Sequence, residues 1–315
     1  MNNNIFHDHA FGITTIDSGF MRPQFAASHL LIENNHAAFI DVGTTHSVPR
    51  LLDVLKAKDI PLENVDYVIL THVHLDHAGG ASKIMQFLPN ARVVVHPYGV
   101  QHIVDPSLLI ASTTSVYGEK IFQQYYGEIV PIAAERVIQA EDEQVIKLQG
   151  RSLLFLDTPG HARHHFCIYD ERSKSFFTGD SFGISYQEFD TSKGKFIFAT
   201  TTPTQFEPLV LHESINRLLS YYPKRIYLTH FGEITEVSKL ANKLRSSIDK
   251  QVAIVKSVAE NSDNYHIVLV NELLNYFLLE LQNLGCTLST DTCRKLLRMD
   301  VELNAQGLKM WWDKK

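Results

Sequence analysis

The segment Thr71–Gly80, which reads Thr-His-Val-His-Leu-Asp-His-Ala-Gly-Gly, constrains this chain more than any other feature of its sequence. It follows Tyr67–Leu70, a short apolar run typical of a strand buried inside a sheet. Three histidines and one carboxylate within six positions, directly after a strand end, are not explained by packing. Because imidazole and carboxylate groups are ligands of zinc, iron and manganese, the segment predicts a metal site and not a solvated loop.

The spacing inside this segment indicates how its side chains are presented. His72 and His74 stand two positions apart, so an extended backbone points both side chains to the same side. Asp76 and His77 come next, where we expect the chain to turn into a helix. Gly79-Gly80 follows and permits a close approach of neighbouring backbone. The candidate ligands therefore lie at the junction of a strand and a helix.

The composition describes a chain with room for a large core and no strong attraction to nucleic acid. The 315 residues allow one large domain, or a domain with an extension, and 44% of them are hydrophobic. The net charge is -6 and there is no long lysine or arginine block, which argues against a nucleic-acid backbone as the main partner. We expect a small-molecule substrate instead.

The cysteines and the N-terminal sequence indicate a cellular location. Cys167, Cys286 and Cys293 form an odd, sparse set without a C-x-x-C pair, which suits a reducing cytoplasm. The first residues lack the basic segment and apolar core of a secretory signal, and no apolar run is long enough to span a membrane. We therefore expect a cytoplasmic protein without a membrane partner.

The first hundred residues alternate between strand-like and helix-like patterns. Asn34-Asn35 separates two apolar runs and predicts a tight hairpin turn. The predicted strands are Phe11–Asp17, His29–Glu33, Ala37–Ile40, Tyr67–Leu70 and Val93–Val95, with helices at Pro49–Lys58 and Ala81–Leu88. This order predicts an α/β sandwich-like core.

Beyond this part, candidate ligands again follow predicted strands. His161, Asp180 and His230 each come after a strand, beside a glycine turn, which is a common position for functional groups on a rigid scaffold. Short helices are expected within Val100–Tyr126. The predicted strands are Gln144–Leu148, Ser152–Leu156, Phe166–Tyr169, Ser175–Phe177 and Arg225–Leu228, with a helix at Glu207–Tyr221.

The sequence changes in character after about Glu236, where glycine becomes scarce. Helices are predicted at Val237–Glu260 and Tyr265–Leu281, with shorter helices within Thr287–Met310. We therefore divide the chain into a catalytic domain, residues 1–235, and a helical extension, residues 236–315. Because these helices are too apolar to stand free in water, they must pack on the core, on each other or on a second copy of the chain. We expect a homodimer, since a two-fold contact is the commonest way to cover such a surface.

The candidate ligands suffice for two metal ions that both keep an open position, as catalytic sites do. A water or hydroxide would occupy the position shared by the two ions, about 3.5–4 Å apart. Asp76 and Asp180 would take part in the chemistry directly. The first ion is assigned to His72, His74 and His161, the second to Asp76, His77 and His230, and the bridge between them to Asp180.

Five motifs occur in a fixed order between residues 12 and 232. They are Ile40–Gly43, Thr71–His77 (Thr-His-x-His-x-Asp-His), Pro159-Gly160-His161, Thr178-Gly179-Asp180 and Leu228–Gly232. This set resembles the metallo-β-lactamase-fold hydrolase superfamily. The resemblance implies an αββα sandwich with a binuclear metal site at one edge.

Further short motifs resemble a prokaryotic branch of this superfamily, some members of which append a helical tail. These motifs are Gly19-Phe20-x-Arg22-Pro23, Asp76–Gly80, His96-Pro97, Asp105-Pro106-Ser107 and Thr201-Thr202-Pro203. Asp180 stands where some true β-lactamases have cysteine, so antibiotic hydrolysis is not expected as the native role. Lactonases of acyl-homoserine lactones have tyrosine where this chain has Gly183, although Tyr186 follows nearby.

The favoured interpretation is a binuclear metal-dependent hydrolase, which uses a metal-bridging hydroxide on a small ester, thioester, lactone or phosphoester. Zinc is the expected metal, although iron and manganese suit the same ligands. One alternative is a di-iron or mononuclear-iron oxidoreductase of the same fold. Another is a non-enzymatic binding or regulatory protein that retains the fold. The sequence does not predict the substrate-binding residues.

Two other positions near the candidate ligands need an interpretation of their own. Asp41 has few ligand-type residues around it, so we interpret it as the hydrogen-bond partner that holds one ligand imidazole in a single tautomer. The alternative for Asp41 is a carboxylate in a strand-end turn. His161 directly follows the Pro-Gly turn and is preferred as a ligand over His164 and His165, which are assigned to the rim or the core.

Overall fold

A computed structural model describes residues 5–201, 204–259 and 265–315. Thr202 and Pro203 of the last branch motif, and Glu260 of a predicted helix, lie outside these residues. The chain forms two compact units. Unit 1 comprises the chain up to Asp157, His164–Gly179 and Tyr222–Thr235, and unit 2 comprises Thr158–Arg163, Asp180–Tyr221 and Glu236–Lys315. The domain boundary at residue 235 stays a prediction.

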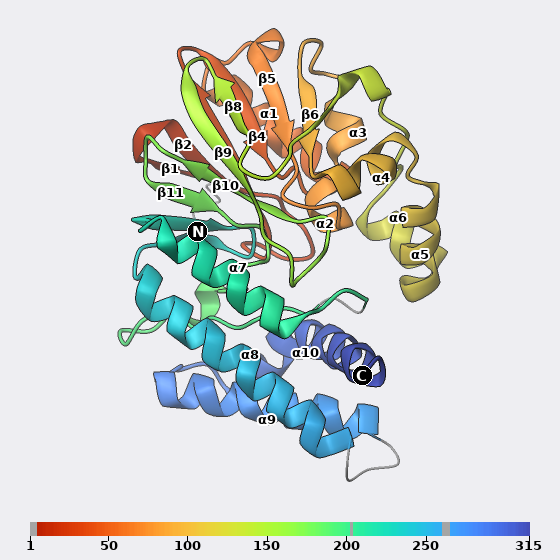
Figure 1. The fold of residues 1–315 in the computed structure, drawn as a ribbon, viewed down its shortest axis with the longest axis vertical. Helices are drawn as coiled ribbons and strands as arrows, with labels where there is room; N and C mark the ends of the chain where they lie inside the picture. Colours follow the sequence, from red (N-terminus) through yellow and green to blue (C-terminus); the bar gives the residue numbers. More distant parts are fainter. Residues whose placement is uncertain (1–4, 202–203, 260–264) are drawn as a thin grey trace. The chain divides into compact units, whose positions relative to one another are not determined.

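Unit 1 contains a seven-stranded sheet with the order β1-β2-β3-β4-β5-β6-β7 (Figure 1). Its strands are β1 (Phe6–His9), β2 (Ile13–Asp17), β3 (Ala27–Glu33), β4 (His36–Ile40), β5 (Val65–Ile69), β6 (Arg92–Val95) and β7 (Val137–Gln139). The pairs from β1 to β4 are antiparallel, and those from β4 to β7 are parallel. The predicted strand Phe11–Asp17 begins too early. Residues 10–12 form a 3₁₀ turn between β1 and β2, so the strand itself begins at Ile13.

The second sheet of unit 1 has six strands in the order β13-β12-β11-β10-β9-β8. They are β8 (Val145–Leu148), β9 (Arg151–Asp157), β10 (Phe166–Asp170), β11 (Ser175–Phe177), β12 (Arg225–Leu228) and β13 (Gly232–Ile234). Only the pair β11–β12 is parallel among these strands of the described chain. The structure thus confirms the predicted α/β class with two sheets.

The predicted hairpin is confirmed between β3 and β4, with Glu33 paired to His36. Asn34 and Asn35 both have positive φ, 48° and 61°, as the two-residue hairpin turn that matches strand twist requires. Asparagine tolerates this conformation better than most residues, which explains why the sequence places two of them there.

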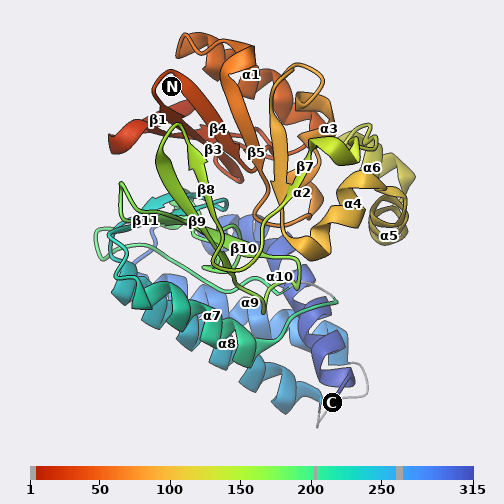
Figure 2. The same ribbon diagram turned by 45° about the horizontal axis from the view of Figure 1, so that its top comes forward.

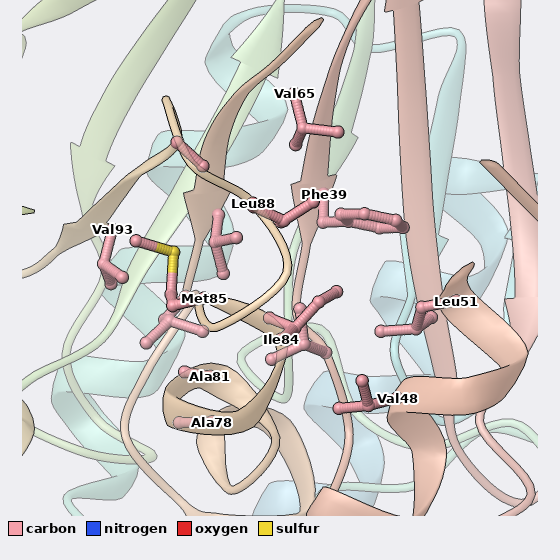
Figure 3. Close-up of a cluster of buried hydrophobic side chains, with 14 of the residues drawn as sticks. Phe39, Val48, Leu51, Val65, Ala78, Ala81, Ile84, Met85, Leu88 and Val93 are labelled. Carbon is pink, nitrogen blue, oxygen red and sulfur yellow. The ribbon is translucent and has the colours of Figure 1, made fainter. Parts of the chain in front are cut away.

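Two hydrophobic clusters flank the seven-stranded sheet. The side chains of β4 alternate between them: Ala37 and Phe39 belong to the outer cluster, whereas Ala38 and Ile40 belong to the inter-sheet cluster. Figure 3 shows the outer cluster, in which Phe39 of β4 packs beside side chains of α1 and α3. The inter-sheet cluster joins residues of both sheets, including Leu31 from β3 and Ile13, Phe155, Phe166 and Phe177 from other strands.

The helices of unit 1 are short. They are α1 (Val48–Ala57), α2 (Leu75–Ala78), α3 (Ala81–Ile84), α4 (Val100–Val104), α5 (Ser107–Tyr117) and α6 (Glu119–Tyr125). The expected helix at Ala81–Leu88 ends earlier, because the backbone tightens into turns in which Phe87 N donates to Ile84 O, ahead of Pro89. The short helices expected within Val100–Tyr126 are confirmed as α4, α5 and α6.

Unit 2 contains the long helices α7 (Pro208–Ser220), α8 (Val237–Ala259), α9 (Tyr265–Leu284) and α10 (Thr290–Asp313). The last three pack against one another, as Figures 1 and 2 show. The prediction of shorter helices after Thr287 was wrong, because α10 is one continuous helix. Its buried stripe contains Asp300 and Asn304, and these polar residues interrupt the apolar pattern. Among the described helices, none is both long and apolar enough to cross a membrane.

Candidate metal centre

The loop after β5 carries the first pair of candidate ligands in unit 1. His72 Nε2 lies 2.8 Å from His74 Nδ1, so the two imidazoles face each other at hydrogen-bonding distance. His72 Nδ1 lies 3.1 Å from Thr71 Oγ1, whose own hydroxyl donates to Asp41. The Thr71 oxygen therefore accepts the Nδ1–H of His72, which leaves a lone pair on His72 Nε2.

A second group of candidate ligands forms where α2 begins. Asp76 Oδ2 lies 3.7 Å from His77 Nε2 and 3.3 Å from His230 Nε2. Asp76, His77 and His230 each offer one ligand atom, and these atoms lie within 4.8 Å of one another. His77 and His230 are buried and Asp76 is partly exposed, so the group lies at the edge of the unit's interior. All three residues belong to unit 1.

The other ring nitrogens of these histidines are held by oxygen acceptors. His77 Nδ1 lies 2.9 Å from Asp41 Oδ2, and His230 Nδ1 lies 2.9 Å from Phe25 O. A carboxylate and a carbonyl can only accept, so each Nδ1 carries the proton and each Nε2 presents its lone pair toward Asp76. This is the tautomer that a metal-binding imidazole needs, with its ring oriented by a second hydrogen bond.

Asp41 follows β4 and is fully buried with a positive φ of 54°. Its carboxylate accepts hydrogen bonds from the Thr71 backbone at 2.8 Å, the Thr71 hydroxyl at 2.9 Å and the Thr229 hydroxyl at 2.8 Å, besides facing His77. Asp41 thus ties the ends of β4, β5 and β12 together directly beside the candidate ligands. Sequence reasoning missed Thr229, whose hydroxyl gives no signal on its own in the sequence.

The glycines after α2 permit the close approach expected of them. Gly80 N donates to Gly43 O at 2.8 Å, and a Cβ on Gly80 would lie 2.7 Å from the carbonyl oxygens of Val42 and Thr44. Any side chain at Gly80 would therefore push the turn that carries Asp41 away from the start of α3.

The two remaining candidate ligands belong to unit 2. His161 Nε2 lies 3.4 Å from Asp180 Oδ2, and both residues are buried. His161 Nδ1 lies 3.4 Å from Thr200 O, a carbonyl, so this imidazole also presents its Nε2 lone pair toward a carboxylate. Gly160, with φ of 116°, forms the turn before His161 and has the backbone of Leu211 2.4 Å from the position of a Cβ. Five of the seven predicted ligands therefore belong to unit 1, and the other two belong to unit 2.

Other histidines surround the ligand loop within unit 1. His165 is fully buried with its ring 4.9 Å from that of His72, and the ring of His164 lies 5.5 Å from that of His74. His96, after β6, pairs with Asp157 at 3.2 Å. In unit 2, Tyr186 is fully buried and donates to Asp300 at 2.9 Å. Cys167 is a fully buried residue of β10.

Electrostatics in this part of unit 1 are affected by one more buried histidine. His29 of β3 lies with Nε2 3.2 Å from Leu228 O and Nδ1 3.2 Å from Thr15 Oγ1. Burial lowers the pKa of His29 to about 4, although Asp41 and the Leu228 carbonyl act in the opposite direction. His29 is therefore neutral at pH 7 and joins β3 to β12, whose end carries His230.

This chain resembles a number of known proteins, among them the three that follow. The metallo-beta-lactamase fold-containing protein ST1585 of Sulfurisphaera tokodaii is 26% identical over 228 residues, 71% of this chain and 80% of that protein. The probable metallo-hydrolase YqjP of Bacillus subtilis is 25% identical over 244 residues, 70% of this chain and 71% of that protein. A hydroxyacylglutathione hydrolase of Aeromonas salmonicida is 26% identical over 189 residues, but the match spans only 54% of its length and 60% of this chain.

The fold and the family follow from two further comparisons. The crystal structure of ST1585, an archaeal metallo-beta-lactamase superfamily protein, matches with a TM-score of 0.67 at 22% identity, over 96% of this chain and 99% of that one. This likeness confirms the predicted fold. The family model described as the Metallo-beta-lactamase superfamily matches residues 21–230, which include every predicted ligand. The chain therefore belongs to the metallo-beta-lactamase superfamily.

Proposed function

We propose that this protein is a metal-dependent hydrolase with two divalent ions, acting on a small ester, thioester, lactone or phosphoester. Zinc is the proposed metal, with iron or manganese as substitutes that the same ligands accept. The observation that carries the proposal is the convergence of Asp76, His77 and His230 within 4.8 Å, with both imidazole Nδ1 atoms held by oxygen acceptors.

The donor set fits a divalent ion at this point. The Nε2 lone pairs of His77 and His230 and one Asp76 oxygen would supply two imidazoles and a carboxylate, fewer ligands than an ion can take, so room remains for the Asp180 bridge and for a water. An open position is what separates a catalytic site from a closed structural one. The tautomers fixed by Asp41 and Phe25 O mean that neither imidazole must lose a proton to bind.

The remaining predicted ligands are His72, His74, His161 and Asp180, which supply three imidazoles and one carboxylate. We propose that the three imidazoles would hold the first ion and that Asp180 would bridge it to the second, the one at Asp76, His77 and His230. The family match, which spans residues 21–230, supports this assignment.

Such ions, when bound, lower the pKa of water to near neutral and polarise the bond under attack. The protein's own groups then have defined tasks. Asp41 keeps the proton of His77 on Nδ1 and stabilises the charge that His77 shares with an ion. Asp76 is partly exposed, so solvent and substrate would reach the second ion from its side. No serine or cysteine nucleophile is needed for this chemistry.

Metal analysis and a substrate panel test the proposal together. Protein purified without chelator should contain close to two ions per chain, and His230→Ala should lower that number, whereas His212→Ala at the surface of α7 should not. A panel of chromogenic esters, thioesters, lactones and phosphodiesters should reveal metal-dependent turnover of at least one class. A reproducible single ion that His230→Ala leaves in place would overturn the binuclear assignment. Strong visible absorption would identify iron in place of zinc.

A further inference from the structure

We propose that the helices at the C-terminal end of the chain set the orientation of His161, through buried amide side chains that clamp residues 199–201. This inference rests on the proposed function, because it assigns a task to groups that position one proposed ligand. The clamp consists of Gln251 on α8 and Asn304 on α10, and all of its members belong to unit 2.

Asn304 is the centre of the clamp. Its Nδ2 donates to Ala199 O at 2.9 Å, and its Oδ1 accepts from Thr201 N at 3.0 Å. The Asn304 backbone carbonyl also accepts from the Thr201 hydroxyl at 3.0 Å. One side chain of α10 therefore holds the peptide units on both sides of Thr200, as a neighbouring strand would.

Gln251 completes the clamp from α8. Its Nε2 donates to Ala199 O at 3.0 Å and to Ser247 Oγ at 3.2 Å, and its Oε1 accepts from Asn304 Nδ2 at 3.0 Å. Ser247 Oγ accepts in turn from Ala199 N at 3.3 Å. The two helices thus bind each other and the same short segment of backbone in a single network.

The burial of this network makes its geometry rigid. Gln251 and Asn304 are fully buried, and Ala199 and Thr201 are 1% exposed. A buried amide that lost its partners would be left with unsatisfied hydrogen-bonding groups, so the segment cannot shift without breaking several bonds at once. An apolar stripe on α8 and α10 would pack the helices equally well, but it would not fix the backbone of residues 199–201.

The clamped segment acts on His161 through the carbonyl of the second held peptide unit, the one formed by Thr200 C=O and Thr201 N–H. Thr200 O lies 3.4 Å from His161 Nδ1 and fixes the tautomer that presents Nε2 toward Asp180. A second contact from α10 reaches the segment after Asp180, because Asp300 accepts from the Tyr186 hydroxyl at 2.9 Å. The extension is therefore a positioning element for the His161–Asp180 pair.

The test measures metal affinity at each site by zinc competition with a chelator, in the full-length chain. Asn304→Leu keeps the volume but removes the amide, and it should weaken the site containing His161 by 10–100-fold, as loss of a ligand-orienting partner does elsewhere. The site formed by Asp76, His77 and His230 should keep its affinity. Gln306→Leu is the matched control, since its amide faces Glu302 elsewhere on α10.

Two milder substitutions, both at Thr201, keep the inference testable if the Asn304→Leu variant does not fold. Thr201→Val removes the hydroxyl that binds the Asn304 carbonyl, whereas Thr201→Ser retains it, so only the valine variant should weaken the His161 site. The absorption bands of the cobalt-loaded protein should shift in Thr201→Val and return in Thr201→Ser, which a loss of stability alone would not produce.

The outcomes separate this inference from the proposed function. Equal affinities of Thr201→Val and Thr201→Ser, or an equal weakening of both sites, overturn the clamp while the two-ion proposal stands. Wild-type protein that binds fewer than two zinc ions overturns the proposed function, and the clamp inference falls with it. Selective weakening at one site, reversed by serine, supports both.

Discussion

Asp41 Oδ2 lies 2.9 Å from His77 Nδ1, and neither side chain has any exposed surface. The carboxylate is held by hydrogen bonds from Thr71 and Thr229, so it cannot rotate away from the imidazole. A buried carboxylate with several fixed donors is an effective partner for a histidine that gives electron density to a cation. Asp41 therefore determines both the tautomer and the position of His77.

Removal of the Asp41 carboxylate should weaken metal binding, although Asp41 is not one of the proposed ligands. Asp41→Asn keeps the shape but reduces the negative charge facing His77 Nδ1, and it should lower metal affinity by about 10–100-fold. Chelator competition measures this change. Asp66→Asn is the matched control, because Asp66 pairs with His36 at 2.8 Å in another part of unit 1. Equal affinities in the two variants would remove Asp41 from the metal centre.

Asp180 should be essential to both proposed ions. Asp180→Ala removes the only side chain assigned to bridge them, so it should lower metal content and abolish turnover. Asp180→Asn retains the shape with less charge, and it should keep part of the metal with little activity. Asp190→Asn serves as the control, since Asp190 pairs with Lys195 at 2.6 Å in the same unit. Wild-type turnover and metal content in Asp180→Ala would disprove the bridge.

The parts that sequence reasoning predicted correctly share one physical property, namely that their signal is local. Val93–Val95 is apolar at every position because β6 is buried on both faces, and Val93 and Val94 lie in different clusters. The Asn34-Asn35 turn is also encoded by its own residues. The ligand motif after β5 is local in the same way, because its candidate ligands occupy nearly consecutive positions, and its metal binding stays a prediction.

The parts that were missed depend on partners distant in sequence. The groups that orient His230 and His161 are the backbone carbonyls of Phe25 and Thr200, and the sequence gives no signal for them because every residue has a carbonyl. The strand Val137–Gln139 has no fully buried side chain, so its pattern carries little signal. Helix α10 was predicted as shorter helices, and its buried stripe contains the polar Asn304, whose amide is bonded to residues about a hundred positions away in the sequence.

The association of the chain can be tested through exposed apolar residues on α9. The buried side of this helix packs within unit 2, but Ile267 and Leu279 are 58% and 54% exposed. If they cover each other in a homodimer, light scattering should give about twice the chain mass of 35.8 kDa. Leu279→Lys should then yield monomers, whereas Leu209→Lys on α7, where the leucine is 77% exposed, should not. A wild-type mass of one chain would exclude the dimer.

His29 should make the folded state less stable in mild acid. Its pKa of about 4 in the folded protein is below its ordinary value of 6.5, because burial disfavours the charged imidazole. The unfolded chain therefore binds a proton that the folded chain does not, and stability is complete above pH 6.5 and falls as the pH drops toward 4. The loss over this range is roughly 3 kcal/mol at most.

The His29→Gln variant isolates this contribution, because glutamine can bond to Thr15 and the Leu228 carbonyl without titrating. Urea unfolding at several pH values should show that the free energy of unfolding of the wild type falls relative to that of the variant between pH 6.5 and 4. His7→Gln, which removes an exposed histidine from β1, controls for the loss of one imidazole. The difference between wild type and variant matters here, since contributions from all other groups cancel in it. A constant difference across this pH range would show that His29 binds its proton equally well in the folded and unfolded chains.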